Sequence, residues 1–244
     1  LPRLTVRLCV INLHATVFFY KGTEPKGIIP QGGARICQTY KNKVHFATMY
    51  DTRNRIPIYS AYIHTNGSNG LIDLKREKNM VIESSNTTEE AKDRQAVSKD
   101  YTAVDATRYD RGHLSPCMHH NNDDSRTATF TLTNIVPQRT ILNQGQWNHY
   151  ETEIMQQFVN GCYRTYVIVG VIRGKSKINN RVNVPSHLWT AACCVNDSNN
   201  PINFLGYIAK NDNNAVEDIN LETLQEQIER DTKRSVTLFE NNCN

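Results

Sequence analysis

Residues 109–116 read Tyr-Asp-Arg-Gly-His-Leu-Ser-Pro and place an arginine and a histidine on either side of one glycine. A neutral imidazole accepts a proton near physiological pH, because the pKa of an unperturbed histidine is about 6.5. An arginine two residues away adds a fixed positive charge that can hold a phosphate group. His113 as a general base and Arg111 as a phosphate ligand therefore indicate cleavage of a phosphodiester, and they require a rigid local fold that holds both side chains together.

Three polar residues downstream extend this pattern: Asn134, Asn143 and Glu151. On a helix Trp147 and Glu151, four and eight residues after Asn143, lie with it along one stripe, with Asn143 at the helix start and Glu151 two turns in. An amide oxygen suits magnesium, which keeps most of its waters and takes few protein ligands. Glu151 can hold one of those waters. The pattern predicts metal-assisted chemistry with Mg²⁺, or with Mn²⁺ or another divalent cation in its place.

The residues around Glu151 have the period of an amphipathic helix. Trp147, Tyr150, Ile154 and Phe158 follow the i, i+3, i+4 spacing, and Gly161 is a suitable end. We therefore expect one helix to carry both the predicted metal ligand and the predicted water ligand.

The Asp-Arg-Gly-His motif, the Asn134 segment and the Asn143 to Glu151 helix together resemble the DNA/RNA non-specific endonuclease family, which includes endonuclease G and the secreted Serratia nuclease. Residues 18–22, 35–38 and 46–62 more closely resemble the vertebrate endonuclease domain-containing 1 proteins, and the likeness runs from residue 18 to the C-terminus. The resemblance implies an α+β fold of the ββα-metal, or His-Me finger, kind, with a central, mainly antiparallel sheet flanked by helices.

The resemblance also implies a role for each matching residue. The histidine at His113 is the general base, and the asparagine at Asn143 is the direct protein ligand of a single magnesium ion. The glutamate at Glu151 orients metal-bound water, while the residues at Arg111 and Asn134 support the phosphate and the site geometry.

Two arginines of the secreted bacterial enzyme do not carry over cleanly. One lies upstream of the motif, where Arg94 is the candidate phosphate ligand although the intervening loop differs. The other lies one turn after the glutamate, where this chain has Met155. These departures bear on substrate affinity more than on the type of reaction.

The leading hypothesis is a secreted, magnesium-dependent endonuclease with little sequence preference that acts on DNA, with RNA as an open second substrate. The alternative is a binding or immune-interaction protein that retains the nuclease scaffold with weak or no catalysis. The complete set of site residues favours the enzyme. The net charge of +4 is compatible with a polyanionic substrate but does not identify one.

Seven cysteines and the sequons at Asn66, Asn86 and Asn196 indicate an oxidising, secretory compartment. Seven cysteines allow three disulfides and one thiol, and the adjacent Cys193 and Cys194 are each expected to meet a distant partner. A zinc site is the competing interpretation, but the chain contains no Cys-X-X-Cys. No stretch is long and apolar enough to predict a membrane span.

The histidines next to the motif have a second interpretation. His119 and His120 suggest another metal site, but adjacent histidines rarely bind one ion together, and we expect a solvated turn instead. His149 is expected to point away from the Asn143 stripe and to lie on the surface.

We expect one domain over residues 18–244. Residues 1–17 are left open between a signal remnant, a strand and unrelated sequence. Residues 65–99 are expected to form a long surface insertion, and the apolar run within 163–173 should be a central strand covered on both faces. The remaining predicted elements are strands and one helix: a hairpin of residues 44–50 and 56–64, a strand at 127–136, a hairpin of 186–195 and 202–210, and a helix at 221–230.

Overall fold

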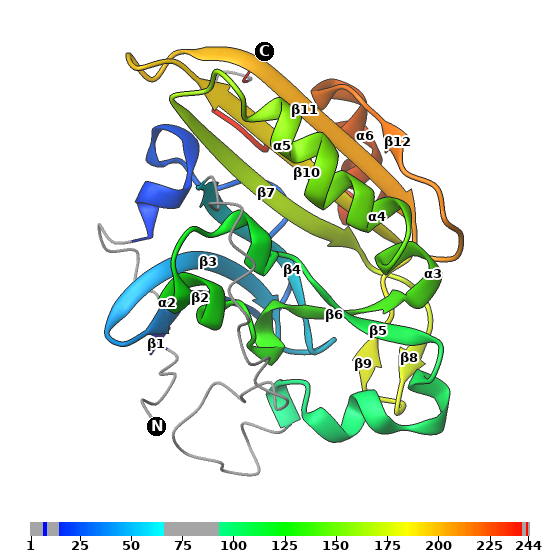
Figure 1. The fold of residues 1–244 in the computed structure, drawn as a ribbon. Coiled ribbons are helices and arrows are strands. Elements are labelled where there is room, and N and C mark those ends of the chain that lie inside the picture. The colour runs from blue at the N-terminus through cyan, green and yellow to red at the C-terminus, as the bar shows by residue number, and fades with distance from the viewer. Residues whose placement is uncertain (1–6, 9–14, 66–92, 241–242, 244) are drawn as a thin grey trace.

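The computed structural model describes residues 7–8, 15–65, 93–240 and 243, and its centre is an eight-stranded sheet in which every neighbouring pair is antiparallel (Figure 1). In spatial order its strands are β1 (Arg7–Leu8), β2 (Gly33–Tyr40), β3 (Lys43–Asp51), β4 (Ile56–His64), β7 (Arg164–Ile172), β10 (His187–Val195), β11 (Pro201–Lys210) and β12 (Glu217–Asp218). The sheet order brings β4 beside β7, although about a hundred residues separate them in the chain.

Two short ribbons and several helices complete the described fold. The ribbons are β5 (Tyr109–His113) with β6 (Ile135–Arg139), and β8 (Lys177–Ile178) with β9 (Val182–Asn183). The helices are α2 (Asp123–Ala128), α3 (Thr140–Asn143), α4 (Gln146–His149), α5 (Met155–Phe158) and α6 (Leu221–Thr232), with a π-helical turn η7 (Tyr150–Ile154) between α4 and α5. The short 3-10 turns are η1 (Thr16–Phe18), η2 (Tyr20–Gly22), η3 (Ser98–Thr102), η4 (Val104–Ala106), η5 (Cys117–His119) and η6 (Leu132–Asn134).

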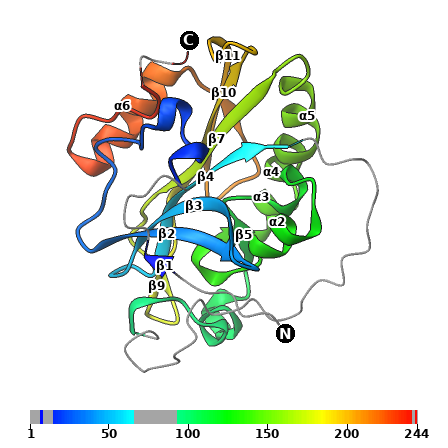
Figure 2. The same ribbon diagram turned by 90° about the vertical axis from the view of Figure 1, so that its left-hand side faces the viewer.

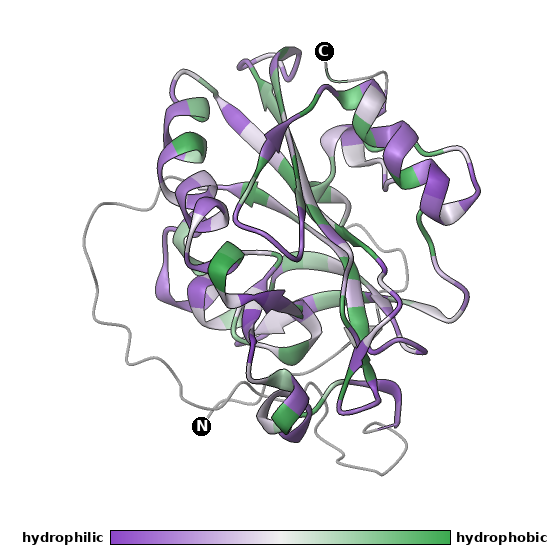
Figure 3. Ribbon diagram, turned by 90° about the vertical axis from the view of Figure 1, so that its right-hand side faces the viewer, coloured by the Kyte–Doolittle hydropathy of each residue, from purple (hydrophilic) through white to green (hydrophobic). Residues whose placement is uncertain are grey.

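The helices cover the two faces of the sheet unequally. Figure 2 shows α6 on one side of the sheet and α2 to α5 on the other. Strand β7 contributes side chains to the hydrophobic cores on both faces of the sheet. Ile168 faces the core beneath α6, while Val167 and Val169 face the core beneath α4 and α5. The prediction of a central strand covered on both faces is confirmed. The strands carry the hydrophobic stretches, whereas much of α6 is hydrophilic (Figure 3).

Helix α6 forms because its ends are capped and one side is apolar. The Asn220 side chain accepts a hydrogen bond from the Thr223 backbone N–H at 2.8 Å, and Leu221, Leu224 and Ile228 are buried against the sheet. Fully burying one such side chain contributes about 1.5–3 kcal/mol. The helix predicted at residues 221–230 is confirmed.

Both predicted hairpins are present as β3–β4 and β10–β11. In the first, the Asp51 carboxylate accepts hydrogen bonds from the backbone N–H groups of Arg53 and Asn54, both at 3.0 Å, and so closes the turn.

The strand predicted at residues 127–136 is wrong over most of its length. Helix α2 extends to Ala128, η6 follows, and only the two residues at the end of the predicted range belong to β6. The Asn122 side chain caps α2 by accepting from the Ser125 backbone N–H at 2.9 Å, and Asp123 adds a favourable charge in the first turn. Most of the predicted surface insertion, with Asn66 and Asn86, lies outside the described residues.

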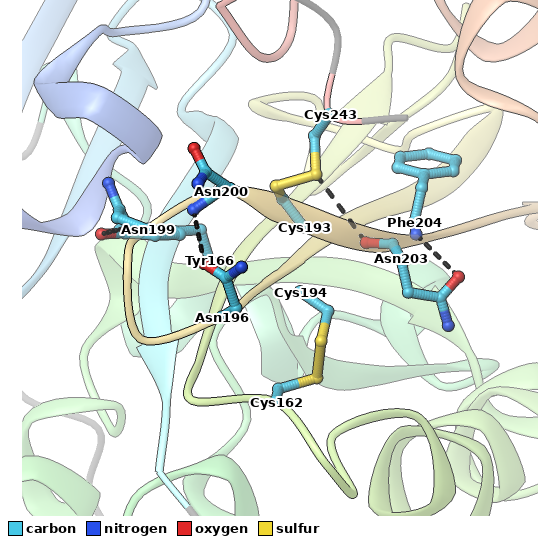
Figure 4. The surroundings of a disulfide bond; sticks show 10 residues. All are labelled: Cys162, Tyr166, Cys193, Cys194, Asn196, Asn199, Asn200, Asn203, Phe204 and Cys243. Atoms are coloured by element: carbon cyan, nitrogen blue, oxygen red, sulfur yellow. Dashed lines mark hydrogen bonds between the residues drawn. A yellow bond between two sulfur atoms is a disulfide. The ribbon is translucent and has the colours of Figure 1, made fainter.

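Two disulfides fix the end of the sheet near the C-terminus (Figure 4). They join Cys162 to Cys194 and Cys193 to Cys243. Neighbouring residues on β10 point to opposite faces, so adjacent cysteines reach different partners, as the sequence predicted. Cys37 is also disulfide-bonded. In the parts of the chain that the structure describes, no helix has the length and apolarity needed to cross a membrane.

Candidate active site

Strand β5 carries the Asp-Arg-Gly-His motif and sets which side chains face together. Alternation along the strand puts Tyr109, Arg111 and His113 on one face and Gly112 on the other. A Cβ atom at Gly112 would overlap the side chain of Gln138, which lies on β6. The glycine of the motif is therefore required by the close approach of the neighbouring strand.

The two candidate reactive side chains are held by aromatic rings. The His113 ring is half-buried and meets Phe130 edge to face, with ring centroids 5.0 Å apart. The guanidinium carbon of Arg111 lies 5.7 Å from the centroid of the Tyr101 ring. No described carboxylate forms an ion pair with Arg111, so its charge is available to an anion.

Asn134 is fully buried, and its amide is saturated by protein partners. Its Oδ1 accepts from the Ser60 hydroxyl and the Ser115 N–H, both at 2.9 Å. Its Nδ2 donates to the carbonyls of Ser115 at 2.9 Å and Thr129 at 3.0 Å. An amide side chain has two donor hydrogens and an oxygen with two lone pairs, so this set uses its full capacity. Asn134 thus fixes the backbone two residues after His113 instead of facing a ligand.

Asn143 is oriented by Asp110 of the motif. Its Nδ2 donates to Asp110 Oδ2 at 2.9 Å, and Gln144 Nε2 donates to the same oxygen at 2.9 Å. Asp110 Oδ1 accepts from the Thr140 hydroxyl at 2.9 Å. The bond to Asp110 fixes the orientation of the Asn143 amide. Its other polar atom, Oδ1, has no hydrogen-bond partner among the described residues.

The expected helix position of Asn143 is wrong. Asn143 is the last residue of α3, and the chain bends at Gln144 and Gly145 before α4 begins. The helix starts earlier because the Thr140 N–H bonds to the Arg108 carbonyl at 3.2 Å. A Cβ atom at Gly145 would overlap Asn214, whose Oδ1 accepts from the first N–H of α4 at 2.7 Å.

Glu151 lies on the π-helical turn, a backbone irregularity often found at functional sites. The Trp147 indole N–H donates to Glu151 Oε1 at 3.0 Å, across the four-residue spacing that put both residues on one predicted stripe. The Glu151 carbonyl also has a side-chain partner, His119 Nε2, at 2.8 Å. Burial raises the pKa of the Glu151 carboxyl to about 8, against the lowering effect of the Trp147 hydrogen bond.

The free oxygen atoms of this site fit a hydrated magnesium ion. Asn143 Oδ1 and Glu151 Oε2 both lack a hydrogen-bond partner among the described residues, and oxygen donors suit Mg²⁺ and Mn²⁺. Within the described ranges, no three His, Cys, Asp or Glu side chains gather in a way that could hold a metal ion. A cation that keeps most of its waters does not require such a cluster.

The sequence model of the DNA/RNA non-specific endonucleases matches residues 27–243, which include the whole of this site. The chain belongs to the DNA/RNA non-specific endonuclease family.

Three comparisons illustrate the likeness of this chain to known proteins. The chain is 28% identical to the human endonuclease domain-containing 1 protein, over 93% of this chain and 47% of that protein. It therefore spans about half the length of that relative. It is 29% identical to a nuclease of a Nostoc strain, over 33% of this chain and 30% of the other. A crystal structure described as the EndoG/EndoGI complex superposes with a TM-score of 0.63 at 19% identity, covering 80% of this chain and 83% of that one. The ββα-metal nuclease fold expected from the sequence is thereby confirmed.

Two histidines next to the motif differ from the sequence-based interpretation. His119 and His120 are 1% and 3% exposed, so they do not form a solvated turn. His119 Nδ1 bonds to the Tyr62 hydroxyl at 2.8 Å, and the His64 ring centroid lies 4.5 Å from that of His119. Burial lowers the pKa of His120 to about 3, which keeps its ring neutral. His149 is exposed, as predicted.

The two arginine positions that did not carry over are now placed. Arg94 is exposed on a short helical turn and forms no hydrogen bond or ion pair with a described residue. Met155, the first residue of α5, is fully buried in the core beneath α4 and α5. The structure does not bring Arg94 into contact with Arg111 or His113.

Sequence reasoning missed the roles of Asp110 and His119. Asp110 lies inside the motif, so its position could have indicated a role in the site. Its hydrogen bond to Asn143 could not be predicted locally, because 33 residues separate the two. The bond of His119 to the Glu151 carbonyl spans 32 residues and had no local signal.

Proposed function

We propose that this chain is a magnesium-dependent endonuclease that hydrolyses phosphodiester bonds of DNA, and of RNA as a second substrate, with little sequence preference. Residues 18–244 act as one catalytic domain. Contacts to phosphates carry no direct sequence information, which supports the lack of sequence preference.

The chain's own residues divide the work of hydrolysis. His113 accepts the proton of the attacking water, and Arg111 binds the phosphate whose negative charge grows in the transition state. Asn143 would hold the cation directly and Glu151 would hold it through a water, while Asn134 positions the backbone that follows His113. When bound, the divalent cation would stabilise the charge on the phosphate and on the leaving oxygen. Arg94 remains a candidate ligand for a more distant phosphate.

The observation that carries this proposal is the pairing of Asp110 with Asn143. One strand, β5, presents the base and the phosphate ligand and also fixes the amide that offers its oxygen to a cation. A binding protein that retained only the scaffold would not require this arrangement.

Secretion is supported by the disulfides. The two described disulfides and the bonded Cys37 belong to an oxidising compartment. Asn196, which lies in the β10–β11 turn, is well placed for a glycan.

Incubation with supercoiled plasmid and with RNA tests the proposed activity. In millimolar Mg²⁺ the purified protein should nick and then linearise the plasmid, because the oxygen ligands at Asn143 and Glu151 then hold a cation. Excess chelator should abolish cleavage, and added Mg²⁺ or Mn²⁺ should restore it. Full activity in excess chelator would refute the metal assignment, and no cleavage under any condition would favour the scaffold-only alternative.

Replacing Asp110 by alanine should lower the cleavage rate about 10- to 100-fold and raise the Mg²⁺ concentration needed for half-maximal activity. The amide of Asn143 would lose the acceptor that orients it. Asp105→Ala is a matched control, since among the described residues that exposed carboxylate accepts a hydrogen bond only from the Asn179 N–H, at 2.8 Å. A Mg²⁺ titration of both variants measures the effect, and equal titration curves would contradict the role of Asp110.

A further inference from the structure

A second arginine lies on the same face of the β5–β6 ribbon as Arg111 and His113. Arg139 is the last residue of β6 and pairs directly with Tyr109 across the ribbon. Its guanidinium carbon lies 5.8 Å from the centroid of the Tyr109 ring. Like Arg111, it forms no ion pair with a carboxylate in the described part of the chain. The face therefore carries two arginines whose charge is not neutralised.

The three side chains His113, Arg111 and Arg139 lie in a line that leads away from the reaction centre. Arg111 is two residues from His113 on β5, and Arg139 is the diagonal neighbour of Arg111 on β6. Diagonal neighbours in a sheet are about 7–8 Å apart. Neighbouring phosphates of one DNA strand are about 7 Å apart, because the strand winds around the helix axis as well as rising about 3.4 Å for each nucleotide. With their long side chains, the two arginines can hold phosphates on neighbouring nucleotides.

The backbone that carries Arg139 is fixed on both sides. The Arg139 N–H donates to Asn211 Oδ1 at 2.8 Å, and Asn211 Nδ2 donates to the Pro137 carbonyl at 2.9 Å. On the other side, the Thr140 N–H donates to the Arg108 carbonyl at 3.2 Å. Asn211 is itself buried, so this anchor is not a solvent-exposed contact. A fixed backbone and the Tyr109 ring reduce the conformational entropy that Arg139 would lose on binding an anion.

We propose that Arg139, supported by Tyr109, forms a second phosphate-binding subsite for the backbone phosphate next to the scissile one. This rests on the proposed function in one respect, that a nucleic acid strand occupies the site. Because Arg139 touches a phosphate that does not react, it contributes to binding in the ground state and in the transition state alike. Its loss therefore raises KM and leaves kcat nearly unchanged.

Binding of a fluorescein-labelled 20-base-pair DNA, measured by anisotropy in chelator, tests the subsite without cleavage. Arg139→Gln should weaken binding about five- to tenfold near 0.1 M salt. It should also reduce the magnitude of the slope of log K against log salt by about 1, the contribution of one phosphate contact. Arg139→Lys, which keeps the charge, should retain most of that slope. In Mg²⁺, Arg139→Gln should raise KM for the same DNA with kcat unchanged.

Arg164→Gln is the matched control. Arg164 is exposed on β7, its guanidinium carbon lies 5.9 Å from the Tyr166 ring centroid, and its loss changes the net charge equally. It should bind DNA as the wild type does. If the wild type binds and cleaves DNA but Arg139→Gln and Arg164→Gln bind DNA equally well, the proposed subsite is wrong and the proposed function stands. If the wild type neither binds nor cleaves nucleic acid, both proposals fall. Equal melting temperatures establish that the variants are folded.

Discussion

Replacing His113 by alanine should lower plasmid cleavage by about 10²- to 10⁴-fold, the range typical of acid–base catalysis. The variant loses the imidazole that accepts the water proton, but it keeps Arg111 and therefore the charge that attracts phosphate. DNA affinity should consequently change little. Cleavage rates in matched Mg²⁺ and binding in chelator measure the two effects separately.

Two further substitutions make this result specific. His149→Ala should cleave like the wild type, because His149 is exposed and its ring lies beside Glu153 at 3.3 Å. Arg111→Ala should reduce both cleavage and binding, with a smaller salt dependence of binding, since a phosphate contact contributes to counterion release. Wild-type cleavage by His113→Ala, with contaminating nuclease excluded, would contradict the role of His113 as the base.

The parts of this fold that the sequence predicted well are those with a strong local pattern. The apolar run of β7 predicted a central strand, because a strand that buries consecutive apolar side chains must be covered on both faces. The four-residue spacing predicted that Trp147 and Glu151 lie along one stripe, and the hydrogen bond between them fits that helix geometry. The Asp-Arg-Gly-His motif pointed to the candidate site, because its four residues lie together on β5.

The parts that failed depend on partners distant in sequence or on competing local signals. The strand expected at residues 127–136 competes with a capped helix start at Asn122, and the cap prevails. Burial of His119 depends on Tyr62 and on the Glu151 carbonyl, which approach only after the sheet has formed. Asn143 does lie on a helix, but it is the last residue of α3 and not the first residue of a helix, as predicted. Helix α3 begins at Thr140 because Thr140 bonds to Arg108 and Asp110, which no local pattern indicates.

Asn134 shows the same limit most clearly. Its position in the sequence indicated the site, but its role depends on Ser60, which is 74 residues away, and on a buried chain of hydroxyl and amide groups behind it. Ser60 bonds to Thr48 at 3.0 Å, and Thr48 accepts from Gln38 at 3.0 Å. This polar chain crosses β4, β3 and β2, so the sheet itself fixes the segment that follows His113.

Replacing Asn134 by alanine should therefore lower the free energy of unfolding by about 3–5 kcal/mol. The change leaves the Ser115 N–H and C=O and the Thr129 carbonyl without their partner and removes one of the two hydrogen bonds of the Ser60 hydroxyl. Each unsatisfied buried group costs about 1–3 kcal/mol before relaxation. Cleavage should fall as well, because the backbone after His113 is no longer held. Urea unfolding followed by circular dichroism, together with cleavage rates, measures both effects.

Asn122→Ala is the matched control for this loss of stability. Its side chain caps α2 through the Ser125 N–H and makes one exposed bond to Asn121, so its removal should cost only about 1 kcal/mol. Asn134→Asp keeps the size and one acceptor role of the side chain but removes both amide donors, so it should also be destabilised, because a buried carboxylate then faces the Ser115 and Thr129 carbonyls. If Asn134→Ala unfolds at the wild-type urea concentration but has lost cleavage, Asn134 acts on the substrate and not on the backbone. Its saturated amide would then have to release a protein partner during the reaction.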